Sequence, residues 1–510
     1  MPLNGVVTAQ PAISRLRDDL STAGFGEESL AALWGADAAA ALRRGQRGPA
    51  LRALRQRTGR GALATIARFF VLGLDVDRVD LELALPALGV DGAIGLGVAE
   101  PAGSAILPAV DLRPHAFVDA HGVGAWWILS DLGEVATGRP LREDHVLGVG
   151  GASTTLSALM IPSPVDSVLD LGTGCGIQAL HASRHARRVV ATDISPRALH
   201  FARLNADLNG VTNIEFREGS MFTPVAGEWF DHIVSNPPFV ITPRVDGVPA
   251  YDYRDGGMIG DALVEQVVKG AAAHLAAGGV AQLLGNWEYR GGAEAFPRIG
   301  GWIDAASPAV DAWVIEREVQ DPALYAETWI RDGGTRPGEA FDVLYAAWLD
   351  DFAAREVSSV GFGYLTVRRA AGSPTLRRLE RVAGQLGHNP TGIGQHLAVC
   401  LAAHDWQAAI DDHGLGRAHL VVATDVTEER HYWPGADDPT VMTLHQGGGF
   451  GRSVPLDTAL AAFVGACDGD LSVAAIVAAL AQLLDADERA LRAELLPRIR
   501  DLLVTGFLSP

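Results

Sequence analysis

The stretch that most constrains the fold of this chain runs from Val168 to Phe239. It opens with VLDLGTGCG, which predicts a buried strand, a glycine turn and a helix that follows over 177–185. Because Gly172, Gly174 and Gly176 carry no Cβ, the backbone of the turn can approach a ligand closely. The turn also leaves N–H groups free at a helix N-terminus, so it predicts a nucleotide-like ligand.

A carboxylate follows where a doubly wound fold binds ribose. Residues 188–194 (RVVATDI) predict a second buried strand that ends near Asp193. Asp193 lies about 20 residues past the glycine turn, so we expect it to accept hydrogen bonds from the ribose hydroxyls of a bound nucleotide. The alternative is that Asp193 caps the next helix, a role for which Ser195 competes.

A further strand over 230–234 runs directly into Asn236-Pro237-Pro238-Phe239. The two prolines fix φ and remove two backbone donors. The Asn236 side-chain amide and the Pro237 carbonyl can then accept both N–H groups of one amine or amide. Phe239 offers a flat face for a planar substrate. We therefore predict that Asn236, Pro237 and Phe239 are catalytic. The alternative is a rigid turn without chemistry.

In this order and at this spacing, the motifs make residues 150–290 resemble a class I S-adenosylmethionine-dependent methyltransferase of the NPPY/F group. That group includes the release-factor glutamine methyltransferases and the amino-methyltransferases of nucleic-acid bases. The resemblance implies a Rossmann-like α/β domain with a seven-stranded, mostly parallel sheet, and S-adenosylmethionine as cofactor. Cofactor contacts are implied for Asp170, Gly172, Thr173, Gly174, Gly176, Asp193, Ile194, Gly219, Ser220 and Asn236. The family often has an acid where this chain has Ser220, so a contact of Ser220 with adenine is less securely implied.

The loop over 240–260 contains YDYRDGG and resembles the segment that follows the NPPY motif in these enzymes. Long loops in compact domains usually serve a function, so we interpret it as a substrate lid. Tyr251, Tyr253, Arg254 and Phe239 are expected to bind the substrate. An ordinary surface loop is the alternative. His145, ahead of the glycine turn, is expected to be a packed or exposed histidine rather than a functional one.

A chain of 510 residues is too long for one hydrophobic core, so we expect several domains. Residues 1–130 predict helices and two short strands at 93–98 and 104–112, which favours a winged-helix-like domain that presents the substrate. Residues 131–370 would form the methyltransferase domain. Residues 371–510 predict a helix at 375–386, an irregular segment at 425–443 and a winged-helix-like end. Such flanking modules indicate a partner protein.

Charge and composition narrow the partners and the compartment. The net charge of −20 disfavours a partner bound mainly through phosphates. Residues 43–60 hold seven arginines and no acid, which predicts either a local phosphate-binding patch or a solvated face. The three cysteines form no metal-ligand or disulfide pattern. No signal peptide or membrane span is read, so a cytoplasmic protein is expected. The single lysine and the abundance of alanine and glycine indicate a bacterial source.

The sequence therefore predicts an S-adenosylmethionine-dependent N-methyltransferase that acts on an amide or amine of a protein or small molecule. No strong general base is required, because the proton can leave after transfer. A base amine of RNA or DNA is the alternative that charge disfavours. Two others remain: a biosynthetic enzyme acting on a metabolite amine, and a non-catalytic scaffold that binds the cofactor. No metal is expected.

Overall fold

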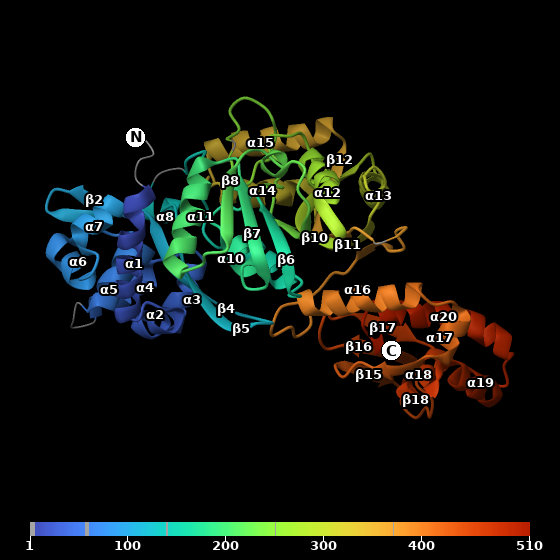
Figure 1. Cartoon of the computed structure of the whole chain (residues 1–510). Coiled ribbons are helices and arrows are strands. Elements are labelled where there is room, and N and C mark those ends of the chain that lie inside the picture. The colour runs from blue at the N-terminus through green and yellow to red at the C-terminus, as the bar shows by residue number, and fades with distance from the viewer. Residues whose placement is uncertain (1–5, 57–60, 139–140, 250, 371) are drawn as a thin grey trace. The chain divides into compact units, whose positions relative to one another are not determined.

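The computed structural model describes residues 6–56, 61–138, 141–249, 251–370 and 372–510 (Figure 1). The chain divides into two compact units. The first comprises Met1–Ser157, Pro164–Val314 and Glu318–Ser373, and the second comprises Ala158–Ser163, Ile315–Arg317 and Pro374–Pro510. Arg57 and Arg60 of the arginine-rich segment lie outside the described residues, whereas Arg43, Arg44 and Arg52 are exposed. Within the described residues, no helix is both long and apolar enough to cross a membrane.

The first unit begins with short helices and a small antiparallel sheet of order β1-β3-β2. The helical elements are α1 (Val6–Thr22), α2 (Glu27–Trp34), α3 (Ala36–Arg43), α4 (Gly48–Gln56), α5 (Ala62–Ile66), the π-helical turn η1 (Ala67–Val71), α6 (Arg78–Ala84) and α7 (Gly89–Leu96). The strands are β1 (Val76–Asp77), β2 (Ala99–Ala102) and β3 (Ala105–Pro108), followed by the hairpin of β4 (Asp111–Asp119) and β5 (Gly122–Ser130). The strand expected at 93–98 is wrong, because helix α7 occupies most of that range. Short apolar runs fit both structures.

A mostly parallel sheet forms the centre of the first unit. It has eight strands in the order β13-β11-β12-β10-β9-β6-β7-β8, of which β13 (Arg377–Arg381) is an edge strand. Strand β12 runs antiparallel to β10, while β6, β7, β8, β9 and the adjoining part of β10 pair in parallel. The strands are β6 (Val165–Leu171), β7 (Ala186–Asp193), β8 (Ile214–Glu218), β9 (Phe230–Ser235), β10 (Leu275–Arg290), β11 (Asp311–Gln320) and β12 (Val357–Arg368). The predicted Rossmann-like, mostly parallel sheet is confirmed, but it has eight strands rather than the expected seven, because β13 pairs at its edge.

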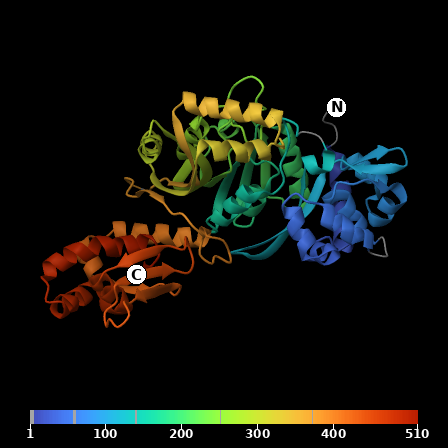
Figure 2. The same ribbon diagram turned by 180° about the vertical axis from the view of Figure 1, so that it is seen from behind.

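This region also contains helices and one short helical turn. They are α8 (Glu134–Thr137), α9 (Gly151–Leu159), α10 (Ile177–Ala182), α11 (Pro196–Asn209), the 3-10 turn η2 (Thr223–Val225), α12 (Ala262–His274), α13 (Phe296–Asp304), α14 (Pro322–Asp332) and α15 (Glu339–Ala354). Helices α10 and α11 pack on β6, β7 and β8, whereas α12, α14 and α15 pack on β12. Figure 2 shows α14 and α15 side by side.

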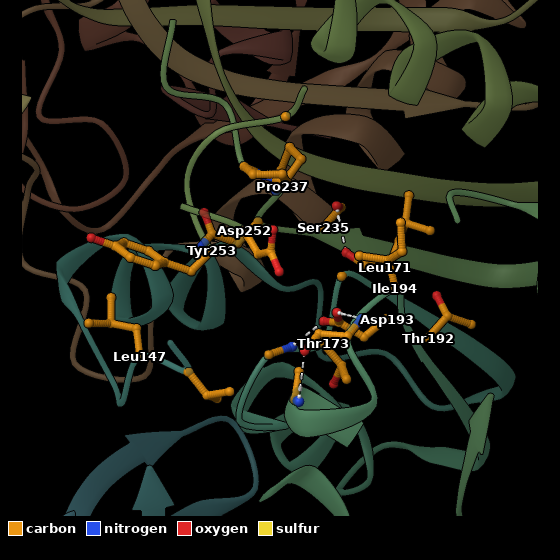
Figure 3. Close-up of a pocket in the computed structure, with 18 of the residues that line it drawn as sticks. Leu147, Leu171, Thr173, Thr192, Asp193, Ile194, Ser235, Pro237, Asp252 and Tyr253 are labelled. Atoms are coloured by element: carbon orange, nitrogen blue, oxygen red, sulfur yellow. Dashed lines mark hydrogen bonds between the residues drawn. The ribbon is translucent and has the colours of Figure 1, made fainter. Parts of the chain in front are cut away.

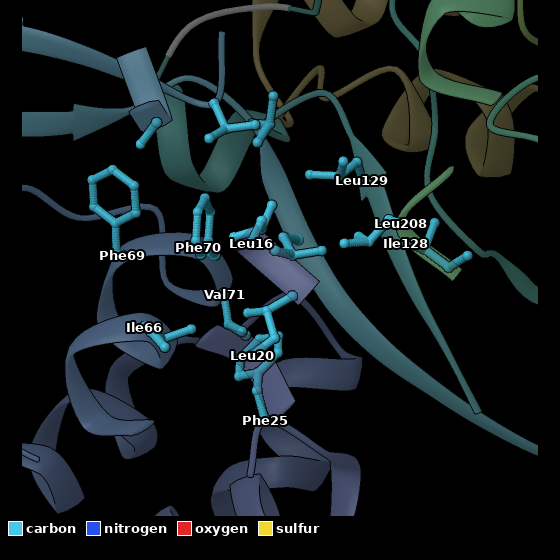
Figure 4. Close-up of a cluster of buried hydrophobic side chains, with 14 of the residues drawn as sticks. Leu16, Leu20, Phe25, Ile66, Phe69, Phe70, Val71, Ile128, Leu129 and Leu208 are labelled. Carbon is cyan, nitrogen blue, oxygen red and sulfur yellow. The ribbon is translucent and has the colours of Figure 1, made fainter. Parts of the chain in front are cut away.

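One hydrophobic core joins the N-terminal helices to the sheet region. It includes Leu16 and Leu20 of α1, Phe70 of η1, Leu129 of β5 and Leu208 of α11 (Figure 4). Burial of such side chains is the main favourable term in folding. The boundary expected near residue 130 thus falls within a continuous core, and the three-domain division stays a prediction.

Two asparagines of α11 extend this connection by hydrogen bonding to the backbone of β5. The Asn205 amide accepts from Leu129 N (2.7 Å) and donates to Leu129 O (2.9 Å). Asn209 repeats the pattern with Trp127 N (2.9 Å) and O (2.8 Å). Asn205 Nδ2 also donates to the carbonyl of Cys175 in the glycine turn (2.8 Å). Strand β5, which carries Trp126 and Trp127, is therefore linked to the glycine turn through the Asn205 side chain.

The second unit has its own core of residues such as Phe463, Ile499, Leu503 and Phe507. Its elements are β13 (Arg377–Arg381), α16 (Gly394–Ala408), α17 (Asp412–Arg417), β14 (His419–Val422), β15 (Val426–His431), β16 (Val441–Gln446), β17 (Ser453–Leu456), α18 (Thr458–Gly465), β18 (Asp468–Ser472), α19 (Val473–Leu483), α20 (Glu488–Val504) and β19 (Leu508–Ser509). Two antiparallel sheets have the orders β18-β14-β19 and β15-β16-β17.

Two expectations for this unit are wrong. The range 375–386 contains strand β13 rather than a helix, and Val382 N beyond it donates to Glu316 O (3.0 Å). The range 425–443 holds the strands β15 and the start of β16 instead of an irregular segment. Backbone pairing with neighbouring strands overrides the local polarity of these stretches. The winged-helix-like character of the flanking modules stays a prediction.

Candidate active site at the carboxyl edge of the sheet

A cavity of about 360 Å³ lies where strands β6, β7, β8 and β9 end (Figure 3). The carboxyl ends of parallel strands are the usual ligand site of open α/β sheets, and this volume falls within the range of small-molecule sites. The predicted residues that line it are Gly172, Thr173, Gly174, Asp193, Ile194, Gly219, Ser220, Asn236, Pro237 and Tyr253. Asp170, Gly176, Phe239, Tyr251 and Arg254 do not line it.

The glycines of the turn have two different tasks. All three have positive φ, at 74°, 55° and 88° for Gly172, Gly174 and Gly176. A Cβ on Gly172 or Gly174 would meet nothing within 4 Å, whereas on Gly176 it would lie 3.0 Å from Ala202 Cβ. Gly172 and Gly174 therefore leave open space at the cavity, and Gly176 allows α11 to approach.

Asp170 stabilises the glycine turn through hydrogen bonds of its carboxylate. Its Oδ2 accepts hydrogen bonds from the Thr173 hydroxyl (2.6 Å) and from Ala179 N (2.9 Å), while Oδ1 is buried without a hydrogen-bond partner in the described part of the chain. Burial raises the pKa of Asp170 to about 7, against the opposing effect of those hydrogen bonds. Asp170 thus stabilises the turn and does not line the cavity, so its position does not support the implied contact with the cofactor.

Asp193 reaches the cavity from the end of β7. Its carboxylate accepts from Gly174 N and from Ser195 N, both at 2.9 Å. Burial raises its pKa above the ordinary value, opposed by those same backbone N–H groups. Ser195, not Asp193, caps α11 by accepting from Ala198 N. The carboxylate is therefore not committed to a helix cap.

The end of β8 continues this edge. Gly219 has φ +153°, and a Cβ there would lie 2.6 Å from Pro224 Cγ. This contact explains why glycine is needed, and it sets Ser220 and Met221 against the cavity. Met221 itself has φ 52°, which is rare for a residue with a side chain.

The turn after β9 presents two acceptors. Asn236 Oδ1 is buried and has no hydrogen-bond partner among the described residues. The Pro237 carbonyl accepts from Phe239 N (2.7 Å), which leaves it one lone pair. The Phe239 ring packs near those of Phe362 (5.6 Å between centroids) and Trp329 (6.5 Å). Its expected stacking on a substrate stays a prediction, since the ring does not line the cavity.

The loop over 240–260 is held by hydrogen bonds among its own residues and by a contact with helix α14. Asp255 accepts from Thr242 Oγ1 and from Tyr251 N (2.6 Å). Arg254 donates to Trp329 O (2.6 Å) and lies over the Tyr251 ring, at 4.7 Å from its centroid. Tyr251 and Arg254 thus brace the loop, while the exposed Asp252 and the ring of Tyr253 line the cavity.

Several lining residues were not foreseen. His145 is 5 % exposed, with its ring centroid 5.9 Å from that of Tyr253, and burial lowers its pKa. Gln178 of α10, 3 % exposed, also lines the cavity. No sequence motif marks either residue, because tertiary packing alone brings them here. Cys175 lines the cavity too, but burial raises its pKa to about 11, so the thiol stays protonated at neutral pH. Across the described ranges, no cluster of three metal-ligating acids, histidines or cysteines occurs.

Comparison with known proteins matches three parts of the chain to families. Residues 150–291 match the methyltransferase small domain, and residues 22–109 and 400–510 match domains of unknown function, DUF7059 and DUF7782. A release factor glutamine methyltransferase of Xylella fastidiosa (strain Temecula1 / ATCC 700964) is 34% identical over 230 residues, which are 42% of this chain and 82% of that protein.

Two further proteins are similar to part of this chain. A protein of Methanocaldococcus jannaschii, named as a putative protein N5-glutamine methyltransferase, is 35% identical over 135 residues, 25% of this chain and 68% of its own. The solved structure of an S-adenosylmethionine-dependent methyltransferase from Thiobacillus denitrificans, in complex with S-adenosyl-L-homocysteine, has 17% identity and a TM-score of 0.26. It covers 43% of this chain and 91% of that one.

Proposed function

This chain belongs to the class I S-adenosylmethionine-dependent methyltransferases of the NPPY/F group, and we propose that it methylates the side-chain amide nitrogen of a glutamine in a protein. The observation that carries the proposal is the pair of acceptors at Asn236 and Pro237. The Asn236 Oδ1 is buried and has no hydrogen-bond partner within the described part of the chain, and both residues line the cavity. The names of the relatives as glutamine methyltransferases support the same acceptor chemistry.

The residues of the cavity fit the cofactor. Gly172 and Gly174 leave open space on the cavity side, and Asp193 offers a carboxylate at the end of β7. Gln178 contributes a buried acceptor oxygen that has no hydrogen-bond partner among the described residues. When bound, S-adenosylmethionine supplies a methyl group already activated on a sulfonium. The ribose contact of Asp193, and the contacts of Ile194, Gly219 and Ser220, are part of this proposal.

The protein's own task is to position the acceptor nitrogen. Asn236 Oδ1 and the free lone pair of the Pro237 carbonyl accept its two N–H groups, which fixes the direction of the nitrogen. Correct placement of reacting groups can lower a barrier by roughly 7–11 kcal/mol in the best cases. Tyr253 and Asp252, on the braced loop, close the acceptor side of the cavity. The proton leaves after transfer, so no strong base is assigned.

The test uses methyl-labelled S-adenosylmethionine and a release factor as acceptor. Labelling of one glutamine is expected, and a matched acceptor with that glutamine replaced by glutamate stays unlabelled. Asn236→Ala is expected to lower turnover about a hundredfold, because it removes a positioning contact. Its affinity for S-adenosylhomocysteine, measured by calorimetry, stays within about twofold of the parent, since the proposed role lies with the acceptor. Label found in RNA and not in protein, or equal loss of turnover and affinity, would contradict the proposal.

A further inference from the structure

Gln178 carries a buried acceptor atom that no described residue of the protein uses. The residue is 3 % exposed and stands in the first turn of α10, directly after the glycine turn. Its Nε2 donates to the carbonyl of Ser153 in α9 at 2.7 Å. Its Oε1 is buried and has no hydrogen-bond partner in the described ranges. Both Gln178 and Ser153 line the cavity.

The orientation of this amide follows from its neighbour. The Ser153 carbonyl can only accept, so the nitrogen of the Gln178 amide has to face it. The oxygen is therefore the free end. Buried polar atoms in folded proteins are almost always paired, and an unpaired one calls for a specific explanation. A donor carried by a ligand in the cavity is such an explanation.

Strand order indicates which part of the ligand lies there. Along the carboxyl edge, β8, β7, β6 and β9 are neighbours in that sequence. Ser220 follows β8, Asp193 ends β7, Gln178 belongs to the helix after β6, and Asn236 follows β9. Adjacent strands lie about 4.8 Å apart. With the ribose at Asp193 of β7, Gln178 belongs to the connection after β6, the strand that lies between β7 and the strand β9 that precedes Asn236. The part of the cofactor beyond the ribose on that side is its sulfur with the attached amino acid.

We propose that Gln178 Oε1 accepts a hydrogen bond from the α-ammonium group of the cofactor's amino-acid end. This inference rests on the proposed function, because it takes the cofactor as S-adenosylmethionine. In the proposed function, Asp193 binds the ribose hydroxyls and the end of β8 lies at the adenine. The α-ammonium is then the remaining donor of the cofactor. A hydrogen bond from a charged donor is stronger than a neutral one. Gln178 thus contacts the amino-acid part of the cofactor and not its nucleoside.

The experiment compares two ligands by calorimetry: S-adenosylhomocysteine, which has the amino acid, and 5′-methylthioadenosine, which lacks it. Gln178→Met keeps the length of the side chain and removes the acceptor. It is expected to weaken S-adenosylhomocysteine about tenfold and to leave 5′-methylthioadenosine within about twofold, since no contact to the nucleoside is lost. Gln178→Glu keeps an acceptor and is expected to retain the preference for S-adenosylhomocysteine.

Gln407→Met in α16 is the matched control. Among the described residues, Gln407 Oε1 is also buried without a hydrogen-bond partner, but Gln407 does not line this cavity. This variant should change neither affinity. Thermal unfolding of each variant without ligand monitors the fold. An equal loss for both ligands in Gln178→Met, or no loss for either, overturns the role of Gln178 while leaving the proposed function intact. Failure of the parent protein to bind S-adenosylhomocysteine overturns both.

Discussion

Asp170 is a buried carboxylate whose ionisation works against the fold. Its pKa of about 7 in the folded protein lies above the ordinary value near 3.9. Between these values the folded state binds a proton that the unfolded state does not, so this group makes the protein more stable as pH falls from about 8 to 5. Asp170→Asn mimics the protonated form and can still accept from Thr173 and Ala179.

We expect Asp170→Asn to raise the free energy of unfolding at pH 8 by on the order of 1–3 kcal/mol, because no charge is buried. The gain should shrink as pH is lowered through 7. Denaturant unfolding of the ligand-free protein at several pH values measures it. A stabilisation that is constant between pH 5 and 8 would show that Asp170 titrates normally in the folded state.

The residues that the sequence identified best are those whose role depends on the backbone. Gly172 and Gly174 at the turn and Asp193 at a strand end line the cavity as expected, because strand, turn and strand fix where they lie. The sequence did not predict in which direction the side chains of a long loop point. Arg254 is 6 % exposed and braces the loop over 240–260, and this depends on α14, which is distant in sequence.

At the scale of elements, the contact of the glycine turn with α11 predicts that two glycine substitutions in this turn differ in their effect on stability. Gly176→Ala combines positive φ with a Cβ about 3 Å from Ala202, so it strains the turn and pushes α11 away. We expect it to lower the free energy of unfolding by about 2–4 kcal/mol. Gly174→Ala has positive φ but open space and should cost about 1 kcal/mol, with the larger effect on affinity for S-adenosylhomocysteine.

Urea unfolding and calorimetry on both variants separate these effects. The pair is matched, since each adds one methyl group to the same turn. The interpretation fails if Gly174→Ala is the more destabilised protein, because the contact with Ala202 would then not be the limiting one.

Strands that are buried on both faces were predictable from the sequence, whereas short or exposed elements were not. The strands of the central sheet read as apolar runs that end in glycine, an acid or a proline turn. The segment 93–98 is equally apolar, yet it lies largely in helix α7, since a run of that length has no periodicity to separate the two structures. Strand β15 is almost wholly exposed and polar, so only its pairing with β16 defines it.

At the scale of the whole molecule, the sequence predicted more than one core but not where the cores begin. The expected N-terminal domain shares the core of the sheet region, through contacts of residues such as Leu20 and Leu208 that are far apart in the chain. Sequence patterns record which residues are apolar but not which distant partner covers them. The second unit, by contrast, is closed around a core drawn from residues 415–508.

Two separate cores predict two unfolding transitions. S-adenosylhomocysteine, bound by the first unit, should raise only one of them, and at a hundred times its dissociation constant the gain is about 2.7 kcal/mol. Leu503→Ala removes a fully buried side chain of the second core and should lower the other transition, by about 2–5 kcal/mol. Differential scanning calorimetry with and without ligand measures both. A single transition that responds to both the ligand and Leu503→Ala would show instead that the two cores unfold together.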